Sequence, residues 1–135
     1  PFRASSLDQD LLDRDFTINA MALHLSADFT TTSLVDPVSG LADLQHDLLR
    51  MVSGDAFAND PLRIVKGVRH ATALHLQIEE KTLDCMQAGS TELCRVAPER
   101  IRQEVWKILA SKDAARGFHL LSESNVGNYL FKKNY

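Results

Sequence analysis

The sequence has few cysteines, no long apolar run and no excess of positive charge, and each absence excludes a class of protein. Cys85 and Cys94 are its only cysteines, without the C-x-x-C spacing or histidine pair of a zinc site, so we expect two reduced thiols in a cytoplasmic protein. No apolar stretch approaches the roughly 20 residues of a membrane span, and no signal-peptide pattern is present, so no membrane partner is expected. The net charge of −3 argues against a simple basic nucleic-acid-binding module but allows a local basic face.

The composition is that of an ordinary globular chain, with 44% hydrophobic and 24% charged residues among 135. It opens at Pro1 rather than Met, which indicates a piece of a longer protein. The patterns predict an α+β fold that is mostly helical, with a boundary near Leu76 between a mixed part, residues 1–76, and an all-helical part, residues 77–135. The predicted strands are residues 20–25, 30–35 and 49–52, and the predicted helices begin at Ser6 and span residues 41–48, 62–74, 79–87, 98–110 and 114–122.

Three polar clusters are candidates for chemistry, and each also has a purely structural interpretation. In the first, Arg14, Asp15 and Asn19 surround the apolar residue Phe16. Arginine can bind a phosphate with two hydrogen bonds, and the carboxylate and the amide can bind sugar hydroxyls. The alternative is a helix end with local ion pairs.

The second cluster is Asp36, Gly40 and Asp43, within the sequence DPVSGLADL. Proline and glycine favour a turn here, and an acidic first turn suits the dipole of the helix that follows. For this cluster the structural interpretation is favoured.

The third cluster places Asp60 before Pro61 and then cations at every third position, at Arg63, Lys66 and Arg69. Asp60 is predicted to cap the helix. The cations could hold a polyphosphate or could simply form a solvated basic face. A carboxylate beside a guanidinium matches the amino donor and ring-nitrogen acceptor of cytosine and adenine, so the Asp60–Arg63 pair could accept these bases and reject uracil and guanine.

The order of five segments resembles class II tRNA nucleotidyltransferases (CCA-adding enzymes) and bacterial poly(A) polymerases. These segments are RDFTINAMA, DPVSGLADL, LLRMV, DPLRIVKGVRHA and PERIRQEVWKIL, and the resemblance runs from about residue 7 to residue 109. The resemblance implies the C-terminal half of a nucleotidyltransferase head followed by the start of a helical neck. It also implies that the parent protein adds CMP or AMP to RNA 3′ ends, tRNA above all, without a template, with ATP and CTP as substrates.

The resemblance implies a role for each candidate residue. Arg14 and Asp15 would contact the triphosphate and ribose, and Asn19 would support their turn. Asp60 and Arg63 would read the base, while Lys66 and Arg69 would face the triphosphate. Glu99 and Arg100 would brace the head against the neck, as members of a structural set that also includes Asp36, Gly40 and Asp43.

The family's Asp-x-Asp ligands for magnesium have no counterpart in this sequence. We therefore expect no catalytic and no metal-binding residue here, Mg²⁺ ligands upstream in the full-length protein, and an inactive fragment. Half of a head sheet would also expose apolar surface, through which the fragment could oligomerise.

Three positions depart from the family pattern: Asp13 and Lys66 stand where arginine is usual, and Asn59 stands where glutamate is usual. They motivate a second hypothesis, a diverged RNA-binding or regulatory relative without catalysis. A third is a helical scaffold with no nucleotide contact.

Overall fold

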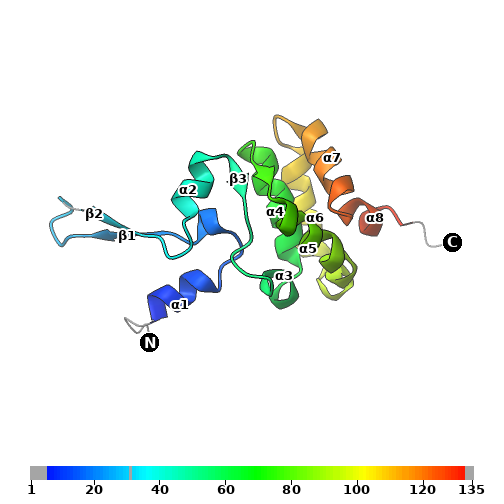
Figure 1. Cartoon of the computed structure of the whole chain (residues 1–135). Coiled ribbons are helices and arrows are strands. Elements are labelled where there is room, and N and C mark those ends of the chain that lie inside the picture. The colour runs from blue at the N-terminus through cyan, green and yellow to red at the C-terminus, as the bar shows by residue number, and fades with distance from the viewer. Residues whose placement is uncertain (1–5, 31, 133–135) are drawn as a thin grey trace.

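The computed structural model describes residues 6–30 and 32–132, and it is mostly helical with two small sheets, as the sequence predicts (Figure 1). The α-helices are α1 (Ser6–Leu12), α2 (Gly40–Gln45), α3 (Ala56–Asn59), α4 (Leu62–Ala73), α5 (Glu80–Gly89), α6 (Pro98–Leu109), α7 (Ala114–Glu123) and α8 (Val126–Leu130). The strands are β1 (Ala22–Leu25), β2 (Thr32–Val35), β3 (Leu48–Leu49) and β4 (Gln77–Ile78), and the 3₁₀ helices are η1 (Thr17–Asn19) and η2 (Ser90–Arg95). No helix among the described residues is long and apolar enough to cross a bilayer.

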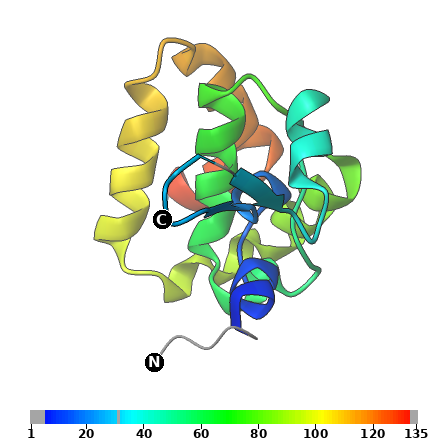
Figure 2. The same cartoon turned by 90° about the vertical axis from the view of Figure 1, so that its left-hand side faces the viewer.

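Helix α4 lies at the centre of the molecule and packs against α6 and α7 (Figures 1 and 2). Its apolar residues recur at helical spacing, so they form one continuous face. The face predicted from the sequence is buried: Ile64, Val65, Val68 and Ala71 are fully inaccessible and Thr72 is nearly so. This burial, rather than helix propensity, supplies most of the stability of a helix of this length.

The N-cap position of α4 is Pro61, one residue later than the predicted cap Asp60, although Asp60 still binds the first turn of the helix. The Asp60 carboxylate accepts a hydrogen bond from the Leu62 N–H at 3.2 Å, which satisfies one of the donors left free at a helix start. Pro61 lacks an N–H and has a φ of −61°, which the first turn accommodates.

The predicted hairpin is present as β1 and β2, which pair antiparallel from Ala22 opposite Val35 to Leu25 opposite Thr32. It projects away from the helical body (Figure 1). The predicted third strand is shorter than expected: β3 ends at Leu49, and Met51 forms only an isolated bridge with Phe16. Strand β3 pairs in parallel with β4, which the sequence did not predict because two residues carry no periodicity.

Residues 77–135 were predicted to be all helical, but they include the strand β4, and the helical elements η2 and α8 were also not predicted. The buried face of α6 also differs from the prediction: Leu109, expected inside, is 47% exposed, and Glu104 is buried instead. Leu109 is the last residue of α6, where the chain turns towards α7. One hydrophobic cluster extends from Phe16 through α4 to Val126, across the proposed division near Leu76, which stays a prediction.

Candidate nucleotide-binding site

A polar pocket of about 460 Å³ lies between the turn after α1 and the N-terminal half of α4. Six of the seven predicted nucleotide-binding residues line it, together with one residue that the sequence did not indicate. The lining residues are Asp10, Arg14, Asp15, Asn19, Asp60, Arg63 and Lys66. Residues 50 positions apart in the sequence therefore share one pocket, which no local pattern could show.

The turn after α1 is held by a buried aromatic ring and by hydrogen bonds within the turn. Phe16 is completely buried, and its ring lies 6.0 Å from that of Phe57 and 6.1 Å from that of His70. Asp15 Oδ1 accepts from the Phe16 N–H at 2.7 Å and from the Asn19 amide at 3.3 Å. The carboxylate and the amide therefore have fixed orientations in the pocket wall.

Arg14 forms an ion pair with Asp10, with 3.0 Å between Nη2 and Oδ2. Both side chains are half exposed, and exposed pairs of this kind contribute at most about 1 kcal/mol to stability. The guanidinium can therefore exchange Asp10 for a stronger anion such as a phosphate at little cost. Asp10 is the lining residue missed from the sequence; its position one helical turn before Arg14 was the available signal.

Asp60 and Arg63 both border the pocket, and backbone contacts orient each of them. Arg63 donates from Nη2 to the Asp13 carbonyl at 2.8 Å and from Nη1 to the Ala56 carbonyl at 3.3 Å. Asp60 is oriented by the Leu62 N–H through Oδ1. Since guanidinium carries five donors, Arg63 retains others for a ligand.

Lys66 lies one turn further along α4, and it has no ion-pair partner within residues 6–30 and 32–132. Its ammonium is therefore available to an anion without first breaking a salt bridge. Arg69, by contrast, is not among the lining residues. Its Nε lies 2.5 Å from Glu104 Oε2 on α6, so the triphosphate role implied by the resemblance is a prediction that the pocket geometry does not support.

His70 of α4 contacts Asn19 in the opposite wall of the pocket, and no sequence pattern had distinguished this histidine from the others. Its Nε2 lies 3.3 Å from Asn19 Nδ2. An amide nitrogen only donates, so Nε2 accepts and the ring is neutral. Burial, and secondly the charge of Arg69, lower the pKa of His70 below its ordinary value of 6.5, which agrees with a neutral ring.

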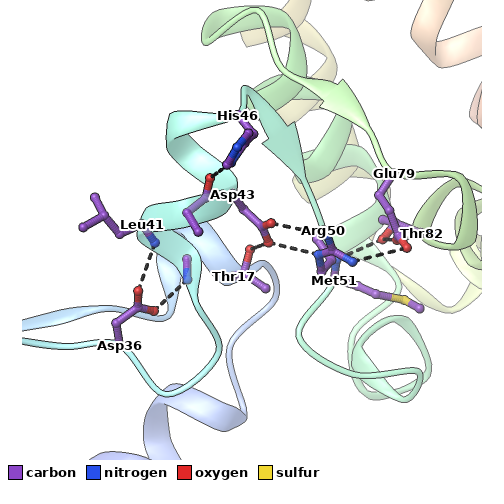
Figure 3. Close-up of polar contacts among 11 residues, drawn as sticks. Thr17, Asp36, Leu41, Asp43, His46, Arg50, Met51, Glu79 and Thr82 are labelled. Carbon is purple, nitrogen blue, oxygen red and sulfur yellow. Dashed lines mark hydrogen bonds and ion pairs between the residues drawn. The ribbon is translucent and has the colours of Figure 1, made fainter.

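The second predicted cluster is absent from the pocket lining, and its contacts are drawn in Figure 3. Asp36 accepts from the N–H groups of Gly40 at 2.6 Å and Leu41 at 3.0 Å, so it caps the start of α2. Gly40 is required by close approach, because a Cβ there would collide with the backbone carbonyl of Thr17. Asp36 and Gly40 therefore have the structural role, in a turn followed by a helix, that was favoured for this cluster from the sequence.

Asp43 ties α2 to the turn that forms the pocket wall (Figure 3). It is buried, accepts from the Thr17 hydroxyl at 2.7 Å, and pairs with Arg50 Nε at 3.0 Å. The hydrogen bond to Asp43 raises the pKa of Arg50 above its ordinary value, so the guanidinium stays charged. Arg50 also reaches Glu79 at 3.6 Å, which connects α2 to the start of α5.

The last predicted pair lies in the first turn of α6. Arg100 approaches Asp60, with 3.6 Å between Nη2 and Oδ2, so α6 contacts a pocket residue directly. Glu99 is exposed in the same turn, where a carboxylate suits the helix dipole.

The pocket does not provide a magnesium site. No group of three or more His, Cys, Asp or Glu side chains in the described part of the chain could hold a metal ion. Its carboxylates are engaged otherwise: Asp10 with Arg14, Asp15 with the turn, and Asp60 with the α4 cap.

Comparisons with known families and proteins show which family this chain belongs to. The family model described as "Poly A polymerase head domain" matches residues 2–50, and the one described as "Probable RNA and SrmB- binding site of polymerase A" matches residues 75–133. The chain therefore belongs to the family of tRNA nucleotidyltransferases (CCA-adding enzymes) and poly(A) polymerases.

Two curated relatives illustrate the similarity. The chain is 41% identical over 109 residues to a CC-adding tRNA nucleotidyltransferase of Geobacter sulfurreducens, a match covering 81% of this chain and 24% of the relative. It is 40% identical over 131 residues to a multifunctional CCA protein of Haemophilus ducreyi, covering 93% of this chain and 31% of the relative. The chain thus spans about a quarter to a third of the length of the curated relatives it matches.

Solved structures match over nearly the whole chain. The Thermotoga maritima CCA-adding enzyme complexed with tRNA superposes with a TM-score of 0.88 at 34% identity, covering 98% of this chain and 32% of that one. A complex of a CCA-adding enzyme with CTP superposes with a TM-score of 0.87 at 34% identity, covering 97% and 32%. The chain accordingly has the fold of the corresponding third of these enzymes.

Proposed function

We propose that this chain binds and selects the incoming nucleotide in a template-independent RNA nucleotidyltransferase that adds CMP or AMP to RNA 3′ ends. The observation that carries the proposal is the pocket in which Arg14, Asp15, Asn19, Asp60 and Arg63 meet. These groups provide hydrogen-bond donors and acceptors from two separate segments, and Lys66 adds a cation that has no ion-pair partner in the described part of the chain. Similar chains occur in enzymes solved with CTP and with ATP.

Base selection follows from the donor and acceptor pattern of Asp60 and Arg63. Both side chains are held by backbone groups, so they form a rigid edge rather than an adaptable one. The carboxylate accepts from the exocyclic amino group of cytosine or adenine, and the guanidinium donates to the ring nitrogen beside it. Uracil and guanine would set a carbonyl against the carboxylate, which leaves polar groups unpaired at about 1–3 kcal/mol each.

The remaining groups of the pocket fit the rest of a nucleoside triphosphate. Arg14 and Lys66 supply positive charge for the phosphates, and Arg14 only has to leave an exposed ion pair with Asp10. Asp15 and Asn19 are fixed by the turn and can bind ribose hydroxyls. The chain therefore contributes binding and orientation, while Mg²⁺ and its ligands belong to an upstream segment of the full-length protein.

For the full-length protein we propose a cytoplasmic enzyme that binds the 3′ end of tRNA through residues 77–135. The free state of Cys85 and Cys94 accords with a reducing compartment. The exposed Leu23, Leu25 and Phe29 of the hairpin region are the apolar surface through which the isolated chain would oligomerise.

Incorporation assays test the activity. Full-length protein with Mg²⁺, labelled CTP or ATP, and tRNA lacking its 3′ end is expected to extend the tRNA. Nucleotide binding without any incorporation would favour the alternative, a diverged non-catalytic relative. Two of the positions that motivated this alternative differ in their relation to the pocket. Asp13 is outside the pocket lining and accepts a hydrogen bond from the Gln9 amide at 2.9 Å, whereas Lys66 lines the pocket.

Substitutions of the base-reading pair test selection. Arg63→Ala is expected to weaken CTP and ATP binding by about 10- to 100-fold, as loss of a charge-assisted hydrogen bond predicts. Asp60→Asn keeps an oxygen for the Leu62 N–H and replaces the other acceptor with a donor, so discrimination against UTP and GTP should relax. Arg102→Ala removes an exposed arginine of α6 outside the pocket and serves as the control. Unchanged binding in Arg63→Ala would support the scaffold hypothesis.

A further inference from the structure

An ion pair joins α4 to α6 through Arg69, which is not among the residues that line the pocket. Arg69 Nε and Glu104 Oε2 lie 2.5 Å apart, and the side chains are only 29% and 9% exposed. The contact is an ion pair rather than an aligned hydrogen bond, and neither atom has a hydrogen-bond partner among the described residues. On α6, Glu104 lies between the buried residues Ile101 and Ile108, at a position where an apolar side chain would be ordinary.

Such a pair contributes little to net stability. Removing two charges from water costs several kcal/mol per ion, and the attraction between them roughly repays that cost. Apolar residues of similar volume often stabilise a protein as well or better. A role in fixing the register of two packed helices accounts for a buried pair better than a role in stability.

A second ion pair between the same segments has the opposite polarity. Arg100 of α6 lies 3.6 Å from Asp60, which precedes α4, so α6 offers a cation there and an anion one turn later at Glu104. If α6 slid by one turn in one direction, Glu104 would approach Asp60. A slide in the other direction would bring Arg100 towards Arg69. Both slides oppose like charges, so the two pairs together select a single register.

We propose that Glu104 is a positioning residue of the nucleotide site. It acts through Arg69, which it withdraws from the pocket, and it fixes the α4 segment that carries Asp60, Arg63 and Lys66. This inference rests on the proposed function, and it replaces the triphosphate contact that the resemblance implies for Arg69. Lys107, 57% exposed and 3.6 Å from the same carboxylate, is a peripheral partner.

Exchange of the two charges tests the proposal in the full-length protein, with dissociation constants for ATP and CTP as the readout. Glu104→Arg alone places two cations together and is expected to weaken binding by about 10-fold or more. The double variant Arg69→Glu/Glu104→Arg restores the pair with the same combined side-chain length and is expected to recover binding to within about 3-fold. Lys107→Gln should bind like the wild type.

Failure to recover binding in the exchanged variant would show that Arg69 contributes its own charge to the nucleotide, and the proposal would be wrong. The variant Arg69→Met/Glu104→Met guards against unfolding, since an apolar pair is expected to keep the urea midpoint at or above that of the wild type. It should nevertheless bind ATP and CTP more weakly, because register is no longer selected. Wild-type affinity in this variant would also overturn the proposal.

Different results would overturn the proposed function and the positioning role of Glu104. If the wild-type protein bound neither ATP nor CTP, the proposed function would fall and the positioning role with it. If the wild type bound and Glu104→Arg bound equally well, only the positioning role would fall.

Discussion

The β1–β2 hairpin and helix α4 both contain apolar as well as polar residues, yet the chain buries them very differently. In α4 seven of twelve residues are buried, whereas no residue of β1 or β2 is fully buried, and Leu23 is 65% exposed. The helix packs on α6 and α7, while the hairpin extends from the body (Figure 1). Since an isolated two-stranded hairpin is marginally stable, the helical body has to carry the stability of this chain.

The largest effect on stability is expected when a phenylalanine packed beside α4 is replaced, in comparison with one in the hairpin region. Phe16→Ala empties a completely buried position beside α4 and should lower the free energy of unfolding by about 3–5 kcal/mol. Phe29→Ala, at a position that is 76% exposed, should change it by less than about 0.5 kcal/mol. Urea denaturation measures both, and similar losses would remove the contrast between the regions.

The next effect concerns the junction of the hairpin with the body. Gly40→Ala inserts a Cβ against the Thr17 carbonyl and should cost about 1–3 kcal/mol through overpacking. Gly54→Ala is the matched control, because nothing lies within 4 Å of the added Cβ there. A neutral Gly40→Ala in thermal unfolding would show that α2 can move away from the pocket wall.

A smaller effect is expected from His70, which makes the free energy of unfolding depend on pH. Its pKa is lowered in the folded state, so the unfolded state binds the proton more tightly. Above pH 6.5 the contribution of His70 to the free energy of unfolding is constant. Below pH 6.5 the free energy of unfolding should fall by up to about 1.4 kcal/mol per pH unit, until the pH reaches the pKa of His70 in the folded state.

His70→Gln keeps an acceptor for Asn19 and should abolish this part of the pH dependence, as measured by urea denaturation between pH 7 and pH 5. His24→Gln, on the exposed hairpin, is the control. Identical pH profiles for wild type and His70→Gln would contradict a neutral, buried His70.

The smallest effect on stability is expected for Leu23→Ser in the hairpin. An exposed leucine contributes little to folding, so the free energy of unfolding should change by less than about 0.5 kcal/mol. If the hairpin mediates oligomerisation, the variant should be more monomeric in sedimentation velocity experiments. A large loss of stability would mean that the hairpin packs on the body in solution.

Much of the fold and most of the candidate site were predictable from local patterns. The buried face of α4, the cap at Asp60 and the hairpin follow from periodicity and turn residues. Strand β4 and helix α8 were missed, because elements this short have too few residues to show a period. Glu104 was missed because a carboxylate becomes buried only when a partner such as Arg69 approaches from another helix.

The sequence alone determined the chemistry available to this protein: which carboxylates, amides and cations it carries, and which of them follow one another by a helical turn. Periodicity is a local property, so it also determined which face of α4 is apolar. Tertiary structure decided that Asn19 contacts His70, that Arg14 and Arg63 share a pocket, and that Arg69 pairs with Glu104 of α6 instead of lining that pocket. The physical reason is that the interaction energy of two charges depends on the distance between them and on their exposure to water. For residues far apart in the sequence, both are set only when their segments pack together.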